Sequence, residues 1–237
     1  MRPGKLLLII LSFFAYNASA QRDLLNMSEH DNKLYYFGIT FGMNYSVYQV
    51  KYTQSFANTD TFKRIQPQWQ PGFNLGLIGN LRISKFIDIR FAPALEFSEK
   101  RILFEYGIVS GAPGDSTSMF SNEAIYMHLP LTFKFKSDRI KNFRFYGLAG
   151  GKFDYDLAAN AHSKRTNEVL KVSATDFGFE FGVGFEFYNP NFIFAPEIKL
   201  SQGLTNQIYT GDKGLPLNNA IQSLRTRMII ISIHLEG

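Results

Sequence analysis

The side chains best suited to chemistry in this chain are its four histidines, because imidazole can act as a general base or bind a metal near neutral pH. His128 and His234 lie in alternating segments, whereas His30 and His162 lie in irregular ones. No G-x-S-x-G or H-E-x-x-H motif is present. Isolated histidines bind a metal only with suitably placed partners, which spacing alone does not define. We therefore expect no catalytic residue, cofactor or metal, and keep catalysis by His128 or His234 as an alternative.

A second chemically interesting group consists of acidic and basic residues that alternate with apolar ones. Successive side chains of a strand point to opposite faces, so these charges would share one face of a sheet. An isolated buried ion costs several kcal/mol, so charges enclosed by such a face must be paired. We expect a structural network that fixes strand register, with a proton or ion pathway as the alternative. Its expected members are Arg82, Asp88, Arg90, Glu96, Lys134, Lys152, Glu180, Glu186, Glu197 and Lys199.

The clearest alternation runs over residues 176–187, where phenylalanine or valine fills one row and only glycines and acids fill the other. A soluble sandwich would bury the phenylalanines against a second sheet and expose the glycines and acids. A membrane barrel would instead turn the phenylalanines to lipid and enclose the small and acidic residues in a narrow lumen. The residues that we expect to face lipid include Phe37, Ile39, Phe41, Phe91, Phe177, Phe179, Phe181 and Phe185.

Eight segments with this alternation favour the barrel. They cover residues 35–50, 70–83, 86–106, 123–136, 143–157, 176–187, 192–204 and 221–236. Short turns follow the second, fourth and sixth segments, and the other connections, at 51–69, 107–122, 158–174 and 205–220, are long and polar. The pattern predicts an all-β fold, an eight-stranded antiparallel up-and-down transmembrane β-barrel with short periplasmic turns and longer extracellular loops. Side chains about fill a lumen of this size, so we expect no solute channel.

The amino terminus indicates export. Arg2 and Lys5 precede the apolar run of residues 6–15, and Ala18-Ser19-Ala20 has the form of a cleavage site. Residues 1–20 are thus expected to be a signal peptide, since the apolar run is too short for a membrane anchor. Residues 21–34 are polar and without periodicity, which predicts a flexible periplasmic leader before a barrel at 35–237. We expect localisation in the bacterial outer membrane.

Composition agrees with this class of protein. The 237 residues include 24 Phe and 12 Tyr, enough for outward rows and interfacial girdles, and 19 Gly. The absence of cysteine means that closure of the sheet, not a disulfide framework, must stabilise an exported chain. The formal net charge of +5, which loss of the signal lowers by two, is modest and not clustered, so no nucleic-acid partner is expected.

Three prolines fall inside expected strands, where proline lacks the N–H that the ladder needs. Pro93, Pro130 and Pro196 therefore mark either bulges or local gaps in the ladder.

Several segments resemble the PorT family. They are residues 35–42, 71–76, 81–82, 88–97, 129–131 and 146–151, and the similarity extends over nearly the whole mature chain. The resemblance implies an outer-membrane barrel of the Bacteroidetes type IX secretion system, which exports proteins with C-terminal sorting domains and supports adhesin delivery in gliding relatives. It implies other secretion components as partners and no catalytic residues. The ending Leu235-Glu236-Gly237 departs from the terminal aromatic that barrel insertion usually uses.

Three hypotheses for the function follow. The first is a non-enzymatic component of type IX secretion, embedded in outer-membrane lipid and acting without a small-molecule substrate. The second is a general small barrel for adhesion or envelope integrity. The third is a lipid-modifying outer-membrane enzyme that depends on His128 or His234.

Overall fold

The computed structural model describes residues 25–54, 62–106, 117–158, 170–208 and 220–237. The expected signal peptide and His162 lie outside these ranges. A single antiparallel sheet contains ten strands and is preceded by the short 3-10 helix η1 (Ser28–Asn32). The strands are β1 (Tyr35–Tyr52), β2 (Phe62–Gln68), β3 (Gln70–Arg82), β4 (Ile87–Phe91), β5 (Ala94–Tyr106), β6 (Thr117–Lys136), β7 (Phe143–Asp156), β8 (Thr175–Tyr188), β9 (Ile193–Gly203) and β10 (Ile221–Glu236).

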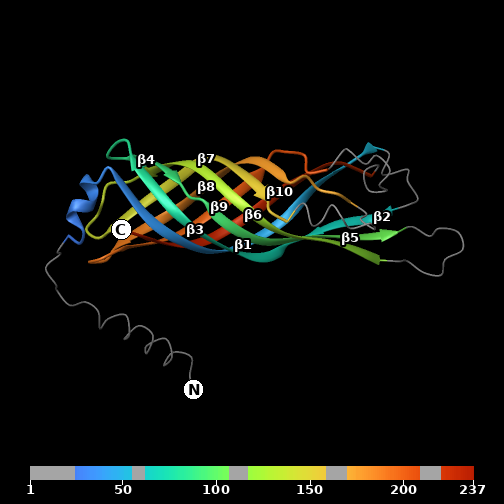
Figure 1. Cartoon of the computed structure of the whole chain (residues 1–237), viewed down its shortest axis with the longest axis horizontal. Coiled ribbons are helices and arrows are strands. Elements are labelled where there is room, and N and C mark those ends of the chain that lie inside the picture. The colour runs from blue at the N-terminus through green and yellow to red at the C-terminus, as the bar shows by residue number, and fades with distance from the viewer. Residues whose placement is uncertain (1–24, 55–61, 107–116, 159–169, 209–219) are drawn as a thin grey trace, which may run out of the picture.

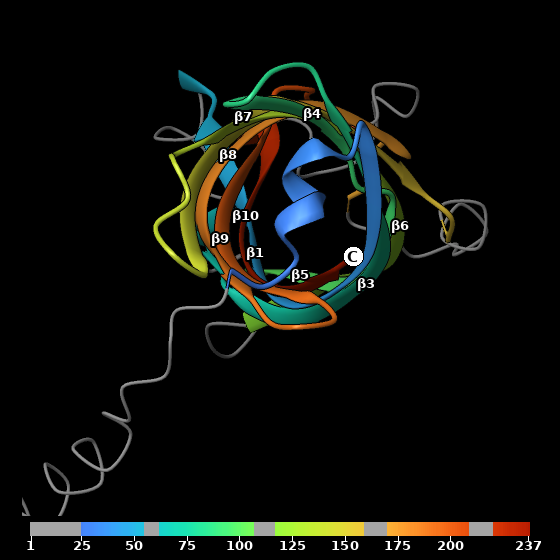
Figure 2. The same ribbon diagram turned by 90° about the vertical axis from the view of Figure 1, so that its left-hand side faces the viewer.

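The sheet closes on itself, because β1 pairs with β10 on one side and with β3 on the other. Consecutive strands are neighbours around the rest of the ring, and the C-terminus lies at the same end of the barrel as η1 (Figures 1 and 2). Short turns connect the strands at the end that holds η1 and the C-terminus (Figure 1). Closure pairs the first and last strands of the ring with each other, as a barrel in a membrane requires, while β2 pairs with β5 alone. The predicted eight-stranded up-and-down barrel is confirmed as a ring of eight.

Two pairs of strands each form one member of this ring. β4 and β5 pair with β6 in the same register on either side of Ala92 and Pro93, so the expected strand 86–106 is interrupted but not shifted. β2 and β3 are separated by Trp69 alone, and their pairing with β5 changes register by one residue across it. The ten strands thus form eight members of the ring, with β2 and β3 counted as one and β4 and β5 as another.

The expected loop at 51–69 was wrong in part, because residues 62–68 form β2 along the outer end of β5. The loop at 107–122 was also too long, since β6 begins at Thr117. Inward-facing Ile102 and Phe104 on β5, together with Ile65 on β2, are buried there. Burial of these apolar side chains stabilises strand pairing beyond the alternating segments.

The three prolines mark gaps, not shifts of register. Pro130 in β6 lies opposite the break at Ala92 and Pro93, so one interruption accommodates two residues that lack an N–H. Pro196 lies in an interval of the β8–β9 ladder where pairing lapses and then resumes in the same register. Each proline therefore removes local hydrogen bonds of the ladder, but the side chains that follow keep the same inward or outward direction.

The described part of the leader is folded against the barrel, so the expectation of a flexible tail was wrong for residues 25–34. Figure 2 shows η1 within the outline of the ring at the end that holds the C-terminus. Asn26 donates its side-chain amide to the Tyr188 carbonyl at 2.9 Å, and Arg82 donates to the His30 carbonyl at 3.0 Å. The leader lacks sequence periodicity because it packs into one end of the barrel as an irregular segment, not because it is solvated.

None of the described helical segments is long and apolar enough to cross a membrane.

Candidate functional site: the barrel interior

The interior face is polar over most of the barrel's length, and its side chains form three levels. The level nearest the C-terminus is closed by the leader. Asp31 accepts hydrogen bonds from Arg144 at 2.8 Å and from Arg139 at 3.4 Å. The His30 ring contacts the Tyr36 ring edge-on, with centroids 4.5 Å apart. This mouth is therefore filled by protein side chains.

Burial and charge shape the acid–base behaviour of this plug. Burial lowers the pKa of the His30 imidazole to about 4, so it is neutral at physiological pH. Burial alone would raise the pKa of Asp31, but its bonds to Arg144 and Arg139 outweigh that effect and hold the pKa below its usual value. A neutral imidazole and an ionised carboxylate are the forms that fit the docked leader.

Arg90 is the centre of the network above the leader. Its guanidinium donates to Glu197 at 2.7 Å, to Glu236 at 2.8 Å and to the Asn80 side chain at 2.9 Å. The same group lies 5.2 Å from the centroid of the Tyr146 ring. Arg90 thus ties together β3, β4, β9 and β10, with each ionic partner almost wholly buried. A buried charge is stable only when ion pairs and hydrogen bonds of this kind compensate for its lost hydration.

Two lysines extend the network toward the leader. Lys134 forms an ion pair with Glu186, a longer one with Glu236 at 3.5 Å, and lies over the Tyr146 ring. Lys136 donates to Asp88 at 2.6 Å, and the Tyr36 hydroxyl donates to the same carboxylate at 2.8 Å. Opposite charges from five strands are therefore matched within the ring.

Tyr146 requires a glycine on the facing strand. A Cβ atom on Gly184 would lie 2.4 Å from the Tyr146 ring and hydroxyl. The missing side chain lets the ring lie flat against β8 and lets its hydroxyl donate to Glu197 at 2.7 Å. This explains one glycine of the alternating row in physical terms.

The middle level is centred on His128. Its Nδ1 lies 2.6 Å from Asp154 and 3.9 Å from Glu96, and its Nε2 lies 3.3 Å from Glu180. Lys152 pairs with Asp154 at 2.6 Å, and Lys199 pairs with Glu180 at 2.7 Å. The cluster is fully enclosed by β5, β6, β7, β8 and β9.

Within the described residues, Glu96, His128 and Asp154 are the group that could hold a metal, with one ligand atom from each within 4.8 Å of the others. Asp154 already accepts hydrogen bonds from His128 and Lys152, both at 2.6 Å. The Lys152 ammonium thus supplies positive charge where a cation would sit. The arrangement is that of a buried ionic network in which His128 bridges carboxylates.

The structure places all ten expected network residues in the interior. Arg82 and Lys199 keep about a tenth of their side chains exposed, and the other eight are buried. It joins them in two linked clusters, around Arg90 and around His128. His128 and His234 come from strands that are not neighbours, yet both line one small cavity with Arg90 and Glu197. That cavity has a volume of about 20 Å³, room for about one water.

The expected list of network residues left out several members, among them Glu236, Asp154, Lys136, Lys100 and Asp31. Lys100 is buried on β5 and lies 4.2 Å from the centroid of the Tyr126 ring. It continues the inward row of Glu96 and Ser98, so the alternation could have found it. Asp31 lies in the leader, where no period exists, and only the folded structure brings it to Arg144.

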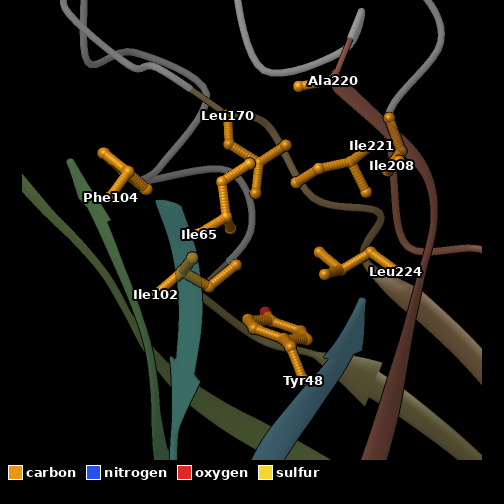
Figure 3. Packing of buried hydrophobic residues seen from close by; sticks show 9 residues of the cluster. All are labelled: Tyr48, Ile65, Ile102, Phe104, Leu170, Ile208, Ala220, Ile221 and Leu224. Atoms are coloured by element: carbon orange, nitrogen blue, oxygen red, sulfur yellow. The ribbon is translucent and has the colours of Figure 1, made fainter. Parts of the chain in front are cut away.

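The outermost level is apolar. Figure 3 shows Tyr48, Ile65, Ile102, Phe104 and Leu224 pointing toward one another from β1, β2, β5 and β10. Leu170, Ile208, Ala220 and Ile221 complete this outer apolar cluster. Ile102, Leu170 and Leu224 have no exposed surface. A packed apolar core thus closes the lumen at the end opposite the leader.

The outward face is the reverse of the interior. The eight residues expected to face lipid are all exposed in the isolated chain, from 37% for Phe179 to 64% for Phe37. Aromatic rings meet along this wall, as between Phe73 and Phe97, which stack with centroids 4.5 Å apart. A surface so rich in exposed large apolar side chains needs an apolar environment.

The family follows from a match that spans residues 20–209 to the model of the outer membrane protein beta-barrel domain. The chain belongs to this family. Membership, together with the closed ring and its apolar outer wall, assigns the protein to the bacterial outer membrane as a small β-barrel.

Solved structures with some likeness include three small outer-membrane barrels. The attachment invasion locus protein Ail of Yersinia pestis is 13% identical, with 86% of this chain and 100% of that chain covered and a TM-score of 0.40. OprG from Pseudomonas aeruginosa is 13% identical, with 84% and 95% covered and a TM-score of 0.39. Neisserial surface protein A is 10% identical, with 84% and 95% covered and a TM-score of 0.41. A search of the curated proteins gives no match.

Proposed function

We propose that the protein is a closed, non-conducting and non-enzymatic outer-membrane barrel that works through its surface, in adhesion or envelope integrity. The observation that supports this best is closure at three levels: the leader, the ionic network and the outer apolar cluster. The small cavity between them holds about one water. A lumen in this state offers no path for a solute, which leaves the outer wall and the outer loops as the parts that can bind.

In this proposal the ionic network has a structural role. Arg90 links four strands, and a shift of one residue in any strand would turn its apolar row inward and its charges toward lipid. The outward phenylalanines, among them Phe177, Phe181 and Phe185, contact lipid hydrocarbon. The network therefore fixes the register that keeps both faces in their proper surroundings. No nucleic acid and no small-molecule substrate is involved.

Catalysis on lipid, the third hypothesis, finds little support in the position of the histidines. His128 and His234 expose only 2% and 4% of their surface and face the lumen, away from the outer wall that meets lipid. The test is activity on lipid A or phospholipid. Activity that vanishes in His128→Ala or His234→Ala, with the barrel still folded, would contradict the non-enzymatic proposal.

The finer role is support of type IX secretion, as the resemblance to the PorT family implies. A scaffold with a blocked lumen would contribute through contacts with other secretion components. The test is deletion of the protein followed by measurement of sorting-domain cargo in the medium. Loss of export that the intact protein restores supports this role, and normal export excludes it.

Replacement of the outer loops separates the two roles. Exchange of residues 107–116 and 159–169 for short Gly-Ser linkers should abolish adhesion to host or neighbouring cells while the barrel still inserts, because β6 and Leu170 of the outer apolar cluster stay intact. Secretion of sorting-domain cargo should not change if adhesion or envelope integrity is the function. Unchanged adhesion and unchanged detergent sensitivity in a deletion strain would contradict the main proposal.

A further inference from the structure

The outer wall formed by β1 and β10 carries basic side chains with no acidic partner among the described residues. Register places Gln49 opposite Arg225 and Lys51 opposite Ser223, while Arg227 lies opposite Val47. Residues directly opposite one another share a face of the sheet. Lys51, Arg225 and Arg227 therefore project together on the outward side. We call these three residues the seam cations, because β1 and β10 are the strands that close the ring.

A groove lies beside them at the rim of the barrel. It has a volume of about 570 Å³ and is lined in part by Gln49, Lys51, Asn206, Gln222 and Arg225. The Asn206 side chain is fixed, since its Oδ1 accepts from the Leu224 amide at 3.0 Å. Val50 and Ser223 complete the described lining of the groove, which contains amides and cations but no carboxylate. Such a surface is complementary to an anion.

Basic side chains on the neighbouring β2–β5 wall have acidic partners. Arg101 on β5 pairs with Glu99, and Arg64 on β2 approaches Glu105 at 3.9 Å. The Ser46 hydroxyl of β1 donates to the Glu99 carbonyl at 2.8 Å, which places that pair close to the level of Val47 and Arg227. At a similar height, the β2–β5 wall is neutralised by its own acids and the β1–β10 wall is not.

The partners of Arg227 orient its charge without cancelling it. Its Nε donates to the Gln202 side chain at 2.9 Å, and Gln202 in turn donates to Gln49 at 2.8 Å. Amide groups hold a guanidinium in place but leave its positive charge for another ligand. Arginine is suited to phosphate, because its planar donors can bind two oxygens at once.

The position of the seam cations along the barrel axis indicates which anion of the membrane they meet. Below Arg227 on the same outward row of β10 lie Ile229, Ile231 and Ile233, and the last two are about half exposed. Outward positions change from apolar to basic at Arg227, toward the end opposite the C-terminus. In the outer membrane this change marks the level of the headgroups of the outer leaflet, where phosphorylated glycolipid is the main anion.

We propose that the seam cations and their groove bind the phosphate groups of an outer-leaflet glycolipid of the lipid A type. The site lies on the wall that joins the first and last strands, so a bound lipid also bridges the seam of the barrel. This inference rests on the membrane location and does not depend on the adhesive or secretory role.

The test uses the full-length mature protein in detergent and measures bound bisphosphorylated lipid A by native mass spectrometry. The variant Arg225→Gln/Arg227→Gln removes two seam cations, and the matched control Arg64→Gln/Arg101→Gln removes two paired arginines of the neighbouring β2–β5 wall. We expect about a fivefold loss of affinity for each seam arginine, roughly twentyfold for both. The control should stay within about twofold. Faster migration on an unheated gel than after boiling checks that each variant is folded.

Two further arms separate lipid from free phosphate. Lipid A stripped of its phosphates should bind the wild type as weakly as bisphosphorylated lipid A binds the seam variant. Inorganic phosphate at the same concentration should not displace the lipid. Equal losses in the seam variant and the control, no preference for the phosphorylated lipid, or displacement by inorganic phosphate would each overturn the proposal.

Discussion

Toward the end that holds the C-terminus the interior side chains are charged and paired, whereas toward the opposite end they are aliphatic and aromatic. Arg90 and Lys134 represent the first region, and Ile102 and Phe104 the second. Both regions fill the lumen, but they depend on different physics. The ionic region needs every partner in place, while the apolar cluster gains from area removed from water and tolerates small changes of shape.

The two regions therefore have different structural roles within one barrel. Ion pairs are directional, so the network selects one register among the strands that it links. Apolar contacts are not directional, so the outer cluster can collect side chains from strand extensions and from irregular segments such as those at Leu170 and Ile208.

Removal of the central guanidinium should have the largest effect. Arg90→Leu leaves Glu197 and Glu236 without their main buried partner, which should lower the free energy of unfolding by about 3–5 kcal/mol. Urea titration of the protein in lipid vesicles measures this loss. Arg90→Leu combined with Glu197→Gln and Glu236→Gln should recover part of it. No recovery would show that the pairing of charge is not what Arg90 contributes.

Truncation in the outer apolar cluster should cost slightly less. Ile102→Ala removes a side chain with no exposed surface and should lower the free energy of unfolding by about 2–4 kcal/mol. The loss should be the same at low and high salt, because no charge is involved, and Ile102→Val should cost about 1 kcal/mol. A salt dependence like that of the ionic region would contradict the distinction between the two regions.

A charge placed on the outer wall should distinguish inside from outside. Phe181→Arg should cost about 2–4 kcal/mol if the side chain meets the middle of the bilayer. Refolding yield and urea stability in vesicles measure it. The neighbouring inward position is the comparison, because a Cβ on Gly182 would lie 2.6 Å from the Ile198 carbonyl and so tests packing. Gly182→Ala should destabilise the protein equally in detergent and in lipid, whereas the effect of Phe181→Arg should be larger in lipid.

Acid should weaken the docked leader by a smaller amount. The pKa of His30 is about 4 in the docked state against 6.5 in the free chain, so the undocked state binds more protons between these values. Docking is therefore fully stable above about pH 6.5 and loses about 1–2 kcal/mol as the pH falls to about 4, after allowance for solvent screening. Glu186, Glu236, Arg82 and Lys33 are the charged groups that act on this imidazole.

A spin label at exposed position 28 measures this undocking as a mobile spectral component that grows below pH 6.5. His30→Gln removes the titrating group and should flatten the response in that window. The contribution of Asp31, whose pKa is lowered, remains until the pH falls below its usual value of 3.8. An unchanged response in His30→Gln would assign the transition to another group.

The fold could be predicted because side chains along a barrel strand alternate between the lumen and the lipid, so that apolar and polar residues alternate in the sequence. Alternation predicted the outward row of Phe177 to Phe187 and the inward row of Glu180 and Glu186. It also predicted that charges would be enclosed. Which charges pair depends on the tilt and stagger of the strands, so the meeting of Arg90 with Glu236 could not be derived from spacing.

Features outside the alternating segments could not be predicted. The leader docks through backbone carbonyls and one carboxylate, Asp31, and no sequence period signals such contacts. The outer apolar cluster joins Tyr48, Leu170 and Ile208 from distant parts of the chain. Strand extensions such as β2 can be recognised only in the folded structure, from the strands with which they pair and the side chains that they bury.

The central claim is that protein side chains close the lumen along its length, and conductance across a planar lipid bilayer tests it most directly. Full-length mature protein inserted at neutral pH should show no stable current steps above the bare bilayer. Arg90→Leu combined with Ile102→Ala should show brief openings, because it weakens both the ionic and the apolar closure. Stable, open-channel steps from the unmodified protein would contradict the claim.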